Sequence, residues 1–463
     1  MNSKLLLAFL LLPWWTGHTT AQSANKPSRR PNVLFIVADD LRANYGDAIA
    51  YTPNLKRLAQ RAVTFNRAYA QYPVCNPSRV SLLTGLRPET TGVLGNNTFF
   101  RDKLPEIVTL PQWLRQNGYF TASLGKIFHR GLTMEDKRAD WADAKSFEHI
   151  RIYDATELGN RGEGRRLAGD EAPWCRWLAA EGTDEDQADG QIAAEAARLI
   201  NEKKDAPWFI GAGFHKPHDP FVAPKKYFDL YPLENIPLAV DPLLDGHARL
   251  PENSLAIPNA YGRFAKFTDR ERREFKRAYL AGVSFMDAQV GKLLDALDQN
   301  KLWDNTIVVF LGDHGYHLGE HGWWNKDTLF ELSARAPLLV AAPGMQRGAT
   351  ANGLVEFVDL YPTLMELAGL SAPHKLEGAS LTPLLKHPNG KGKAAAFTVV
   401  LRNGGQHRGR TVRTERWRYT EWDEGESGVE LYDHRNDPGE YHNLANDPRF
   451  TRVKQTLKTL FSK

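Results

Sequence analysis

The segment 33–38 is an uninterrupted run of six apolar residues, Val-Leu-Phe-Ile-Val-Ala. Strands with one solvent-exposed face alternate apolar and polar residues, so a run without alternation is typical of a strand covered on both faces. Comparable runs recur at 306–311 and 337–342. Such strands lie in the middle of a layered protein, with helices on both sides of a mainly parallel sheet. The three runs therefore predict an α/β fold.

Helical patterns lie between and after these runs. From 268 to 299 the apolar residues recur at a helical spacing, and Thr268 with Glu271 forms a candidate capping box at the start. The segment 359–369 has a proline near its beginning and Gly369 at its end, as helices often do. Strands that alternate with helices predict a large mixed, mainly parallel sheet sandwiched by helices.

The character of the chain changes after about residue 373. A turn-rich segment at 388–393 is followed by short strand candidates and by a terminal helix near 450–461. The strand candidates are 397–401, 409–412, 417–421 and 429–432. We therefore expect a main domain over 31–373 and, over 374–463, a smaller α+β subdomain with an antiparallel sheet.

The first residues have the features of an export signal. Lys4 precedes an apolar run from Leu5 to Trp15, and the small residues at 19–21 offer a cleavage site. The run is too short for a membrane-spanning helix, and no later segment reaches that length. The pattern predicts a signal peptide over 1–21, a leader over 22–30 and a secreted or periplasmic protein without a membrane partner.

The charge of the chain excludes one class of partner. Its 463 residues carry a formal net charge of +4, which suits an anionic substrate but is also ordinary surface variation. The sequence has no lysine and arginine block and no basic stretch interleaved with aromatic residues, so it does not predict nucleic-acid binding.

The chain has two cysteines, Cys75 and Cys175. In an oxidising compartment they could form one disulfide, worth about 4–5 kcal/mol in the chain-entropy model. The alternative is that one of them is chemically active, and the neighbours of Cys75 bear on that choice.

Two of the apolar runs end in acidic residues. Asp39 and Asp40 follow the first run, and Asp313 with His314 follows the run at 306–311. In open α/β sheets, ligands bind beyond the carboxyl ends of the strands. Adjacent carboxylates repel each other unless a cation neutralises them, and carboxylate oxygens favour Ca²⁺ or Mg²⁺. A lone acidic pair often only solvates a loop, but two acidic ends of buried strands predict a metal site.

The residues around Cys75 are the most informative. Pro77 suits the start of a helix with Asn76 as its cap, and Gly85 suits its end. Cys75 would then lie at a helix N-terminus, where free backbone N–H groups attract anions. Arg79 adds a positive fork suited to sulfate or phosphate oxygens. The pattern predicts a nucleophile that attacks an anionic group.

The sequence Cys75-Asn-Pro-Ser-Arg79 resembles the Cys-x-Pro-x-Arg signature of the formylglycine-dependent (type I) sulfatases. The resemblance runs from Pro31 to Asp433 and is nearest to the iduronate-2-sulfatase branch. It implies a sulfuric ester hydrolase with an alkaline-phosphatase-like fold. It also implies that a maturation enzyme oxidises Cys75 to the aldehyde formylglycine, which leaves Cys175 as a free thiol.

The resemblance implies a metal site as well. Asp39, Asp40, Asp313 and the formylglycine at Cys75 would hold the ion, with Ca²⁺ favoured over Mg²⁺. His314 stands where many sulfatases have Asn, and the iduronate-2-sulfatase branch has His there. A nitrogen ligand is unusual for Ca²⁺, so His314 could contact the sulfate as well as the metal.

A strand-like run at 120–124 leads into the segment Gly-Lys126-Ile-Phe-His129. A Lys and a His at this spacing usually lie on a solvated face. Here they resemble the family's Gly-Lys-x-x-His segment, which implies that Lys126 neutralises sulfate charge and orients the formylglycine hydrate. His129 would accept a proton from the second hydroxyl of that hydrate.

Two further segments resemble those of the same branch. His215-Lys-Pro-His218 implies that His218 contacts the scissile ester and protonates the leaving alcohol, with His215 in a structural role. The segment 319–326, Gly-Glu-His-Gly-Trp-Trp-Asn-Lys, implies that Lys326 binds sulfate and the leaving oxygen. Its Glu and His would fix the loop, and its two tryptophans could pack on a sugar face.

Other functions fit parts of this pattern. Phosphodiesterases and phosphonate monoester hydrolases belong to the same superfamily, and some use formylglycine. A catalytically silent glycan-binding relative is the alternative from another class, but the nucleophile, acids, histidines and lysines are all present. The branch resemblance implies a 2-sulfated uronic acid in a sulfated polysaccharide. Arylsulfatases and choline sulfatases share the core motifs, so the substrate stays open.

Overall fold

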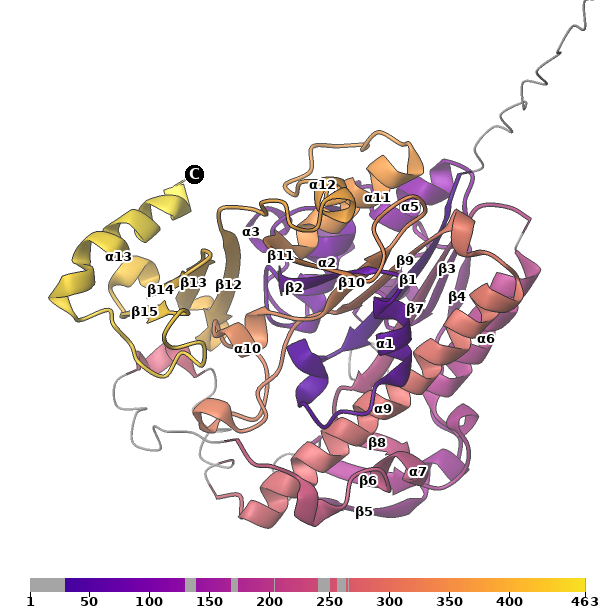
Figure 1. The fold of residues 1–463 in the computed structure, drawn as a ribbon, viewed down its shortest axis with the longest axis horizontal. Coiled ribbons are helices and arrows are strands. Elements are labelled where there is room, and N and C mark those ends of the chain that lie inside the picture. The colour runs from indigo at the N-terminus through magenta and orange to yellow at the C-terminus, as the bar shows by residue number, and fades with distance from the viewer. Residues whose placement is uncertain are drawn as a thin grey trace, which may run out of the picture.

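A central eight-stranded sheet with helices on both faces forms the main body of the protein, and a second, smaller sheet lies at one side of it (Figure 1). The computed structural model describes residues 30–129, 139–167, 174–203, 205–239, 250–255, 264 and 266–462. The predicted α/β class is confirmed.

The central sheet is mixed but mainly parallel. In order across the sheet its strands are β11 (Ala349–Glu356), β2 (Val63–Tyr69), β10 (Leu338–Ala341), β9 (Thr306–Gly312), β1 (Asn32–Asp39), β7 (Trp208–Pro217), β3 (Phe120–Gly125) and β4 (His149–Arg151). The strand β10 pairs antiparallel with both β9 and β2, and the other pairs are parallel. The three apolar runs form β1, β9 and β10.

The strand β1 shows why its sequence is apolar without alternation. Leu34 and Ile36 belong to the hydrophobic cluster on one face of the sheet, and Val33, Phe35 and Val37 belong to the cluster on the other face. All eight residues of the strand are buried. Because helices cover both faces, every position needs an apolar side chain.

Different helices cover the two faces. One cluster contains side chains of α1 (Pro53–Ala59), α6 (Ala188–Glu202) and α9 (Asp269–Gln299). The other contains side chains of α2 (Cys75–Thr84), α5 (Leu110–Gln116), α11 (Leu360–Ala368) and α12 (Thr382–Lys386). The predicted capping box of Thr268 and Glu271 is present at the start of α9, and Gly369 ends α11 in the left-handed conformation.

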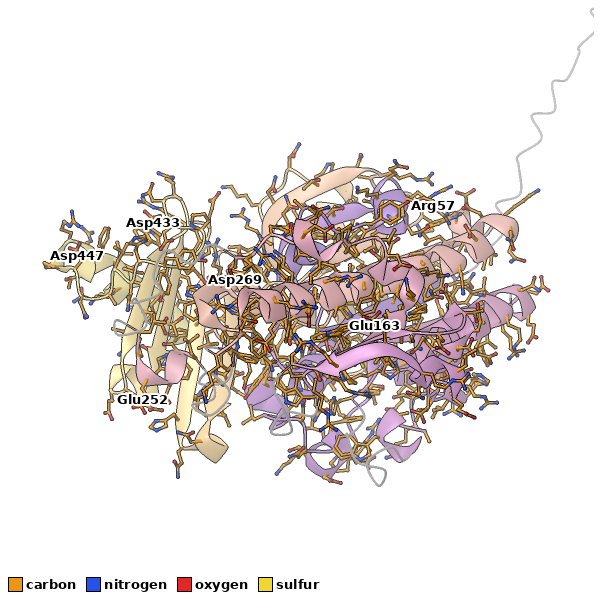
Figure 2. All side chains as sticks on the ribbon, turned by 90° about the horizontal axis from the view of Figure 1, so that it is seen from below. Arg57, Glu163, Glu252, Asp269, Asp433 and Asp447 are labelled. Atoms are coloured by element: carbon orange, nitrogen blue, oxygen red, sulfur yellow. The ribbon has the colours of Figure 1, made fainter. Side chains whose placement is uncertain are left out.

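The sequence did not predict a third, three-stranded sheet. Its strands are β5 (Gly162–Arg166), β6 (Arg176–Ala180) and β8 (Phe221–Pro224), with β6 in the middle. It lies along α9, which crosses the molecule from Asp269 past Glu163 of β5 (Figure 2). Among the described residues, short helices also connect other elements, namely α3 (Pro88–Thr91), α4 (Phe100–Lys103), α7 (Lys225–Phe228) and α10 (Glu331–Ala334).

The C-terminal part forms the small antiparallel sheet that the sequence predicted. Its strands follow chain order: β12 (Ala396–Arg402), β13 (His407–Arg413), β14 (Trp417–Trp422) and β15 (Val429–Asp433). The helix α13 (Thr451–Lys458) packs on it through Leu457, which shares a cluster with Val412, Tyr419 and Leu431. Because α12 still packs in the main core, the domain boundary at 373 stays a proposal.

A buried ionic network joins the small sheet to the main body. Arg418 of β14 donates to Glu440 and to Glu331 of α10, each at 2.5 Å. Tyr69 of β2 donates to the other oxygen of Glu331 at 2.9 Å, and Arg413 of β13 donates to Glu331 at 3.2 Å. The network therefore links β2 of the central sheet, through α10, to two strands of the C-terminal sheet.

The predicted signal peptide over 1–21 and most of the leader over 22–30 lie outside the described residues. Within the described part of the chain, no helix has both the length and the apolar character needed to cross a membrane.

Candidate active site

The acidic residues meet at the carboxyl ends of β1 and β9. These strands are parallel neighbours with Ala38 opposite Gly312, so Asp39, Asp40 and Asp313 arrive at the same edge. The backbone N–H of Asp40 donates to the Asp313 carboxylate at 3.1 Å. Each of the three side chains is at most 1% exposed. Asp40 has a φ of 62°, a conformation that non-glycine residues rarely adopt and that often marks functional sites.

Cys75 is the first residue of α2, so the expected placement at a helix N-terminus is confirmed. The predicted cap is wrong. The N-cap is Val74, and Asn76 lies inside the first turn, where its side chain donates to the carbonyls of Gly95 and Thr98 at 2.9 and 2.7 Å. The helix starts two positions earlier than the cap rule places it, so the Asn76 amide braces the neighbouring loop instead. Gly85 ends the helix as predicted.

Cys75 is fully buried and its thiol is free, as is the thiol of the buried Cys175. The disulfide alternative is therefore absent. The Sγ of Cys75 lies 3.1 Å from Nζ of Lys326 and 3.4 Å from Nε2 of His314. Burial alone would raise the pKa of the Cys75 thiol, but the charges of Lys126, Lys326 and His314 outweigh it and lower that pKa well below its ordinary value.

Four of these side chains could hold a metal ion together. One donor atom each of Asp39, Asp40, Cys75 and His314 lies within 4.8 Å of the others. Asp39 Oδ1 and Asp40 Oδ2 are buried and have no hydrogen-bond partner in the described part of the chain. Buried carboxylate oxygens without hydrogen bonds are costly unless cations offset their charge, so the site fits a divalent ion such as Ca²⁺. The soft thiol suits such an ion least, and the His314 nitrogen is an unusual ligand for Ca²⁺.

Asp313 lies at the edge of this group. Its Oδ1 accepts the backbone N–H groups of Asp40 and His314, both at 3.1 Å, and its Oδ2 accepts from Arg79 at 2.9 Å. Burial raises the pKa of Asp313 to about 6, against the lowering effect of the His314 and Arg79 charges.

Arg79 does not present an open fork to a substrate. Its guanidinium is completely buried, its Nε donates to Asp313, and its Nη2 lies 3.3 Å from Asp39. Its Nη1 also donates to the carbonyl of Lys126. The interpretation of Arg79 as a fork for sulfate oxygens is replaced by one in which Arg79 neutralises and orients two acids of the site.

Two lysines reach the same centre from distant segments. Lys126 follows β3 and pairs with Asp39. Lys326, from the loop between β9 and α10, lies 2.5 Å from Asp40 Oδ1 as well as next to Cys75. The fold thus brings both predicted lysines to the acids and the thiol.

The two predicted histidines differ in charge. Burial would lower the pKa of His218, but Asp40 and Asp219 outweigh burial and raise it to about 9. Its Nε2 lies 3.8 Å from Asp40, and its Nδ1 donates to the carbonyl of Asp219 at 2.5 Å. Burial lowers the pKa of His129, which hydrogen-bonds Cys75, to about 4. Near neutral pH, therefore, His218 can donate a proton and His129 can accept one.

Sequence reasoning missed two residues behind His218. Nζ of Lys216 donates to the carbonyls of His218 and Pro220 at 3.0 and 2.8 Å. Asp189, at the start of α6, accepts the backbone N–H groups of His215 and Lys216 at 2.8 and 2.9 Å. Together they hold the loop that carries His218. A charged residue in a distant helix gives no local signal of such a role.

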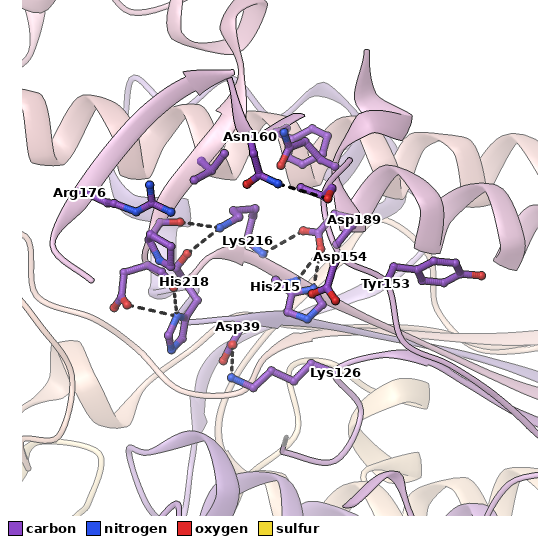
Figure 3. A pocket seen from close by; sticks show the side chains of 17 residues that line it. Asp39, Lys126, Tyr153, Asp154, Asn160, Arg176, Asp189, His215, Lys216 and His218 are labelled. Atoms are coloured by element: carbon purple, nitrogen blue, oxygen red, sulfur yellow. Dashed lines mark hydrogen bonds and ion pairs between the residues drawn. The ribbon is translucent and has the colours of Figure 1, made fainter. Parts of the chain in front are cut away.

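A cavity of about 270 Å³ lies beside this loop (Figure 3). Asp39, Lys126 and His218 form one side of it, and Lys216 and Arg176 lie on another. The cavity gives the catalytic cluster an adjoining space lined by charged and polar groups.

The segment 319–326 folds differently from one expectation. Trp323 and Trp324 are 0% and 3% exposed and pack against Phe264 and Phe275, so the prediction that they face a sugar is wrong. Both side chains are large and apolar, and packing against Phe264 and α9 removes them from water. The Glu and His of the segment do brace the loop: Glu320 pairs with Arg42 at 2.9 Å, and His321 donates to a backbone carbonyl at 3.0 Å.

Comparisons with known proteins agree with this geometry. A family model described as Sulfatase matches residues 31–370, and one described as N-sulphoglucosamine sulphohydrolase, C-terminal, matches residues 319–463. A Formosa agariphila protein named Sulfatase is 34% identical over 99% of this chain and 91% of its own length. Human iduronate 2-sulfatase is 36% identical over 76% of this chain and 71% of its own length.

Solved structures share the fold. The phosphonate monoester hydrolase of Agrobacterium radiobacter has a TM-score of 0.77 at 23% identity, covering 94% of this chain and 95% of its own. A protein solved in complex with its substrate D-glucosamine-2-N,6-O-disulfate has a TM-score of 0.73 at 22% identity, covering 94% of this chain and 97% of its own. At these identities the likeness concerns the fold alone.

Proposed function

Because this chain belongs to the sulfatase family and hydrolyses sulfate esters, we propose that it does so through a formylglycine made from Cys75. The observation that carries the proposal is the position of this thiol. Cys75 is buried at a helix N-terminus, beside two carboxylate oxygens that have no hydrogen-bond partner. A thiol is a poor hydrogen-bonding partner for those acids and a poor ligand for the hard cation they favour. Hydroxyl groups at the same position would donate hydrogen bonds to the acids and bind the cation through oxygen.

The metal would be held by Asp39, Asp40, Asp313, His314 and the modified residue 75. Ca²⁺ is the preferred ion because carboxylate oxygens dominate the set. When bound, it would polarise oxygen atoms and offset negative charge. Arg79 would keep Asp39 and Asp313 ionised and correctly oriented, since it contacts both.

The hydrate of formylglycine would supply two hydroxyl groups on one carbon, one to attack sulfur and one to lose a proton when sulfate leaves. Asp313 is our candidate to take the proton of the attacking hydroxyl, since its pKa is raised to about 6. His129 would accept the proton of the second hydroxyl, because it is neutral and hydrogen-bonds residue 75. Lys126 and Lys326 would hold the negative charge on the sulfate oxygens.

His218 would protonate the leaving alcohol oxygen. It is charged near neutral pH, and its Nε2 faces the acids at 3.8 Å from Asp40. Its other ring nitrogen is held by the Asp219 carbonyl, and Lys216 fixes the loop backbone. A proton donor held on both sides keeps its geometry throughout the reaction.

The substrate that we propose is a sulfated carbohydrate, with a 2-sulfated uronic acid as the first candidate. Iduronate 2-sulfatases are among the relatives, as is a protein from Formosa agariphila named Ulvan-active sulfatase, 29% identical over 99% of this chain and 85% of its own length. We also propose that the protein is exported by its signal sequence and matured by a formylglycine-generating enzyme.

Mass spectrometry of the active protein tests the proposal. We expect an aldehyde at residue 75 and an unmodified thiol at Cys175. Cys75→Ala should abolish turnover of an aryl sulfate and leave the fold intact, whereas Cys175→Ala should keep its turnover. Cys75→Ser should also fail in a host that oxidises only cysteine. A fully active protein with an unmodified Cys75 thiol would refute the mechanism.

Turnover of an aryl phosphodiester, measured beside that of an aryl sulfate, distinguishes the sulfatase activity from that of a phosphodiesterase. We expect the sulfate to be the better substrate. Faster turnover of the phosphodiester would favour the phosphonate monoester hydrolase class.

A further inference from the structure

Two adjoining cavities lie along the seam between the central sheet and the C-terminal sheet. One, of about 640 Å³, is lined by residues 352–354 of β11 and by the segment 388–394. The other, of about 520 Å³, is lined by residues of α10, β13 and the segment after β15. Arg67 of β2 and Glu415 line both, so the cavities adjoin, and we treat them together as one groove. We call it the seam groove.

The seam groove is strongly cationic. Seven lysine and arginine side chains line it, against the two carboxylates of Glu331 and Glu415. Some of this charge is neutralised within the fold: Lys393 pairs with Glu356 at 2.7 Å and Arg413 with Glu331 at 3.2 Å. The Arg416 guanidinium likewise pairs with Asp433.

Other cations of the groove are neutralised incompletely or not at all by acidic side chains. Arg67 donates to the backbone carbonyls of Asn352 and Glu415 and forms no ion pair with a described residue. Lys391 and Arg435 are exposed, and neither forms an ion pair within the described ranges. Arg335 shares the single carboxylate of Glu331 with two other arginines, at 3.6 Å. The fold thus gathers uncompensated positive charges side by side, which favours a bound polyanion.

The lining also indicates the kind of polyanion. It contains no phenylalanine, tyrosine or tryptophan, so bases of a nucleic acid would find no ring to stack on. Guanidinium and ammonium groups spaced along an open groove suit sulfate and carboxylate groups that repeat along a chain. An anionic polysaccharide meets both conditions.

We propose that the seam groove binds an anionic polysaccharide and holds a polymeric substrate outside the catalytic cluster. The proposal rests on the proposed function, in which the substrate is a sulfated carbohydrate. Arg67 and Cys75 are eight residues apart, so their Cα atoms are at most about 29 Å apart even in a fully extended chain. A polymer chain longer than this is long enough to reach from one place to the other, and a polymer held at the groove raises the effective concentration of substrate at the catalytic cluster.

Charge reversal at the two exposed groove residues tests the proposal. The variant Lys391→Glu/Arg435→Glu is compared with Lys56→Glu/Lys301→Glu, a pair of exposed lysines on α1 and after α9 that gives the same change in net charge. Binding of heparin is measured in the Cys75→Ala background, where turnover is not expected. We expect the groove variant to bind heparin about tenfold more weakly at low salt, because two positive groups that face the polyanion become negative and repel it. The control variant should change heparin binding little, because its two altered residues lie outside the groove.

Catalysis gives a second measurement. With Cys75 intact, kcat/KM for a sulfated polymer should fall in the groove variant, while kcat/KM for a small aryl sulfate stays unchanged. Heparin binding equal to that of the unaltered groove, or equal losses in both charge-reversal pairs, would overturn the proposal. Tighter binding of single-stranded DNA than of heparin would overturn it as well. The aryl sulfate assay reports on the proposed function independently, so failure of one is distinguishable from failure of the other.

Discussion

Replacing Arg418 by methionine should cost the protein much of its stability. Arg418 is 1% exposed and donates to Glu440 and Glu331 at 2.5 Å each, between β14 and α10. Removing one partner of a buried ion pair typically costs about 3–5 kcal/mol, because the remaining charge is left uncompensated. Glu331 keeps Arg413 and Arg335, and Glu440 keeps His434. We therefore expect a loss near the lower end, about 3 kcal/mol.

Urea unfolding followed by tryptophan fluorescence measures this loss, since Trp417 and Trp422 lie on the same strand as Arg418. Arg416→Met is the matched control: Arg416 also pairs with an acid, Asp433, but its side chain is 38% exposed. Exposed pairs contribute little, so the control should unfold nearly at the wild-type urea concentration.

The double variant Arg418→Met/Glu440→Gln separates lost packing from uncompensated charge. Because Glu440 then carries no charge to bury, part of the stability should return. Equal losses for Arg418→Met and Arg416→Met, or no recovery in the double variant, would refute the reasoning that burial of this charge pair decides its contribution.

Three further outcomes are expected. Acid should destabilise the protein. The charges of Arg418 and His434 outweigh burial and lower the pKa of Glu440 from 4.5 to about 2. The contribution of Glu440 to the free energy of unfolding is therefore complete above pH 4.5 and is lost as the pH falls toward 2. Unfolding midpoints across that range should therefore fall less steeply for Glu440→Gln than for the wild type. Exhaustive chelation should abolish activity and lower the melting temperature, and unchanged values for both in metal-free protein would contradict the metal site. His218→Ala should harm sugar sulfates more than an activated aryl sulfate, whereas His129→Ala should give a burst followed by a slow steady rate; equal losses without a burst would mean that the roles are misassigned.

Local patterns in the sequence were enough for much of the fold. The apolar run 33–38 predicted a strand covered on both faces, and β1 is buried at every position. The capping box of α9 and the left-handed glycine that ends α11 were also predicted. These features depend on side-chain periodicity and on hydrogen bonds within a few residues, so a single segment contains all the information they need.

The candidate site was predictable for a different reason. Acidic residues after buried strands and a cysteine at a helix start are local patterns, and the family resemblance assigned their roles. Parallel strands bring their carboxyl ends to one edge, which is why Asp39 and Asp313 meet although 274 positions separate them.

The tertiary structure alone decided how side chains with several possible partners are used. Arg79 turned inward to Asp39 and Asp313, and Trp323 and Trp324 became core residues. Asp189 joined the site from α6 without any motif, and Lys216 had no assigned role within its segment 215–218. Such choices depend on which distant groups the packing brings within hydrogen-bond reach and which it removes from water. Neither is encoded in the spacing of residues along the chain, so only the folded structure determines them.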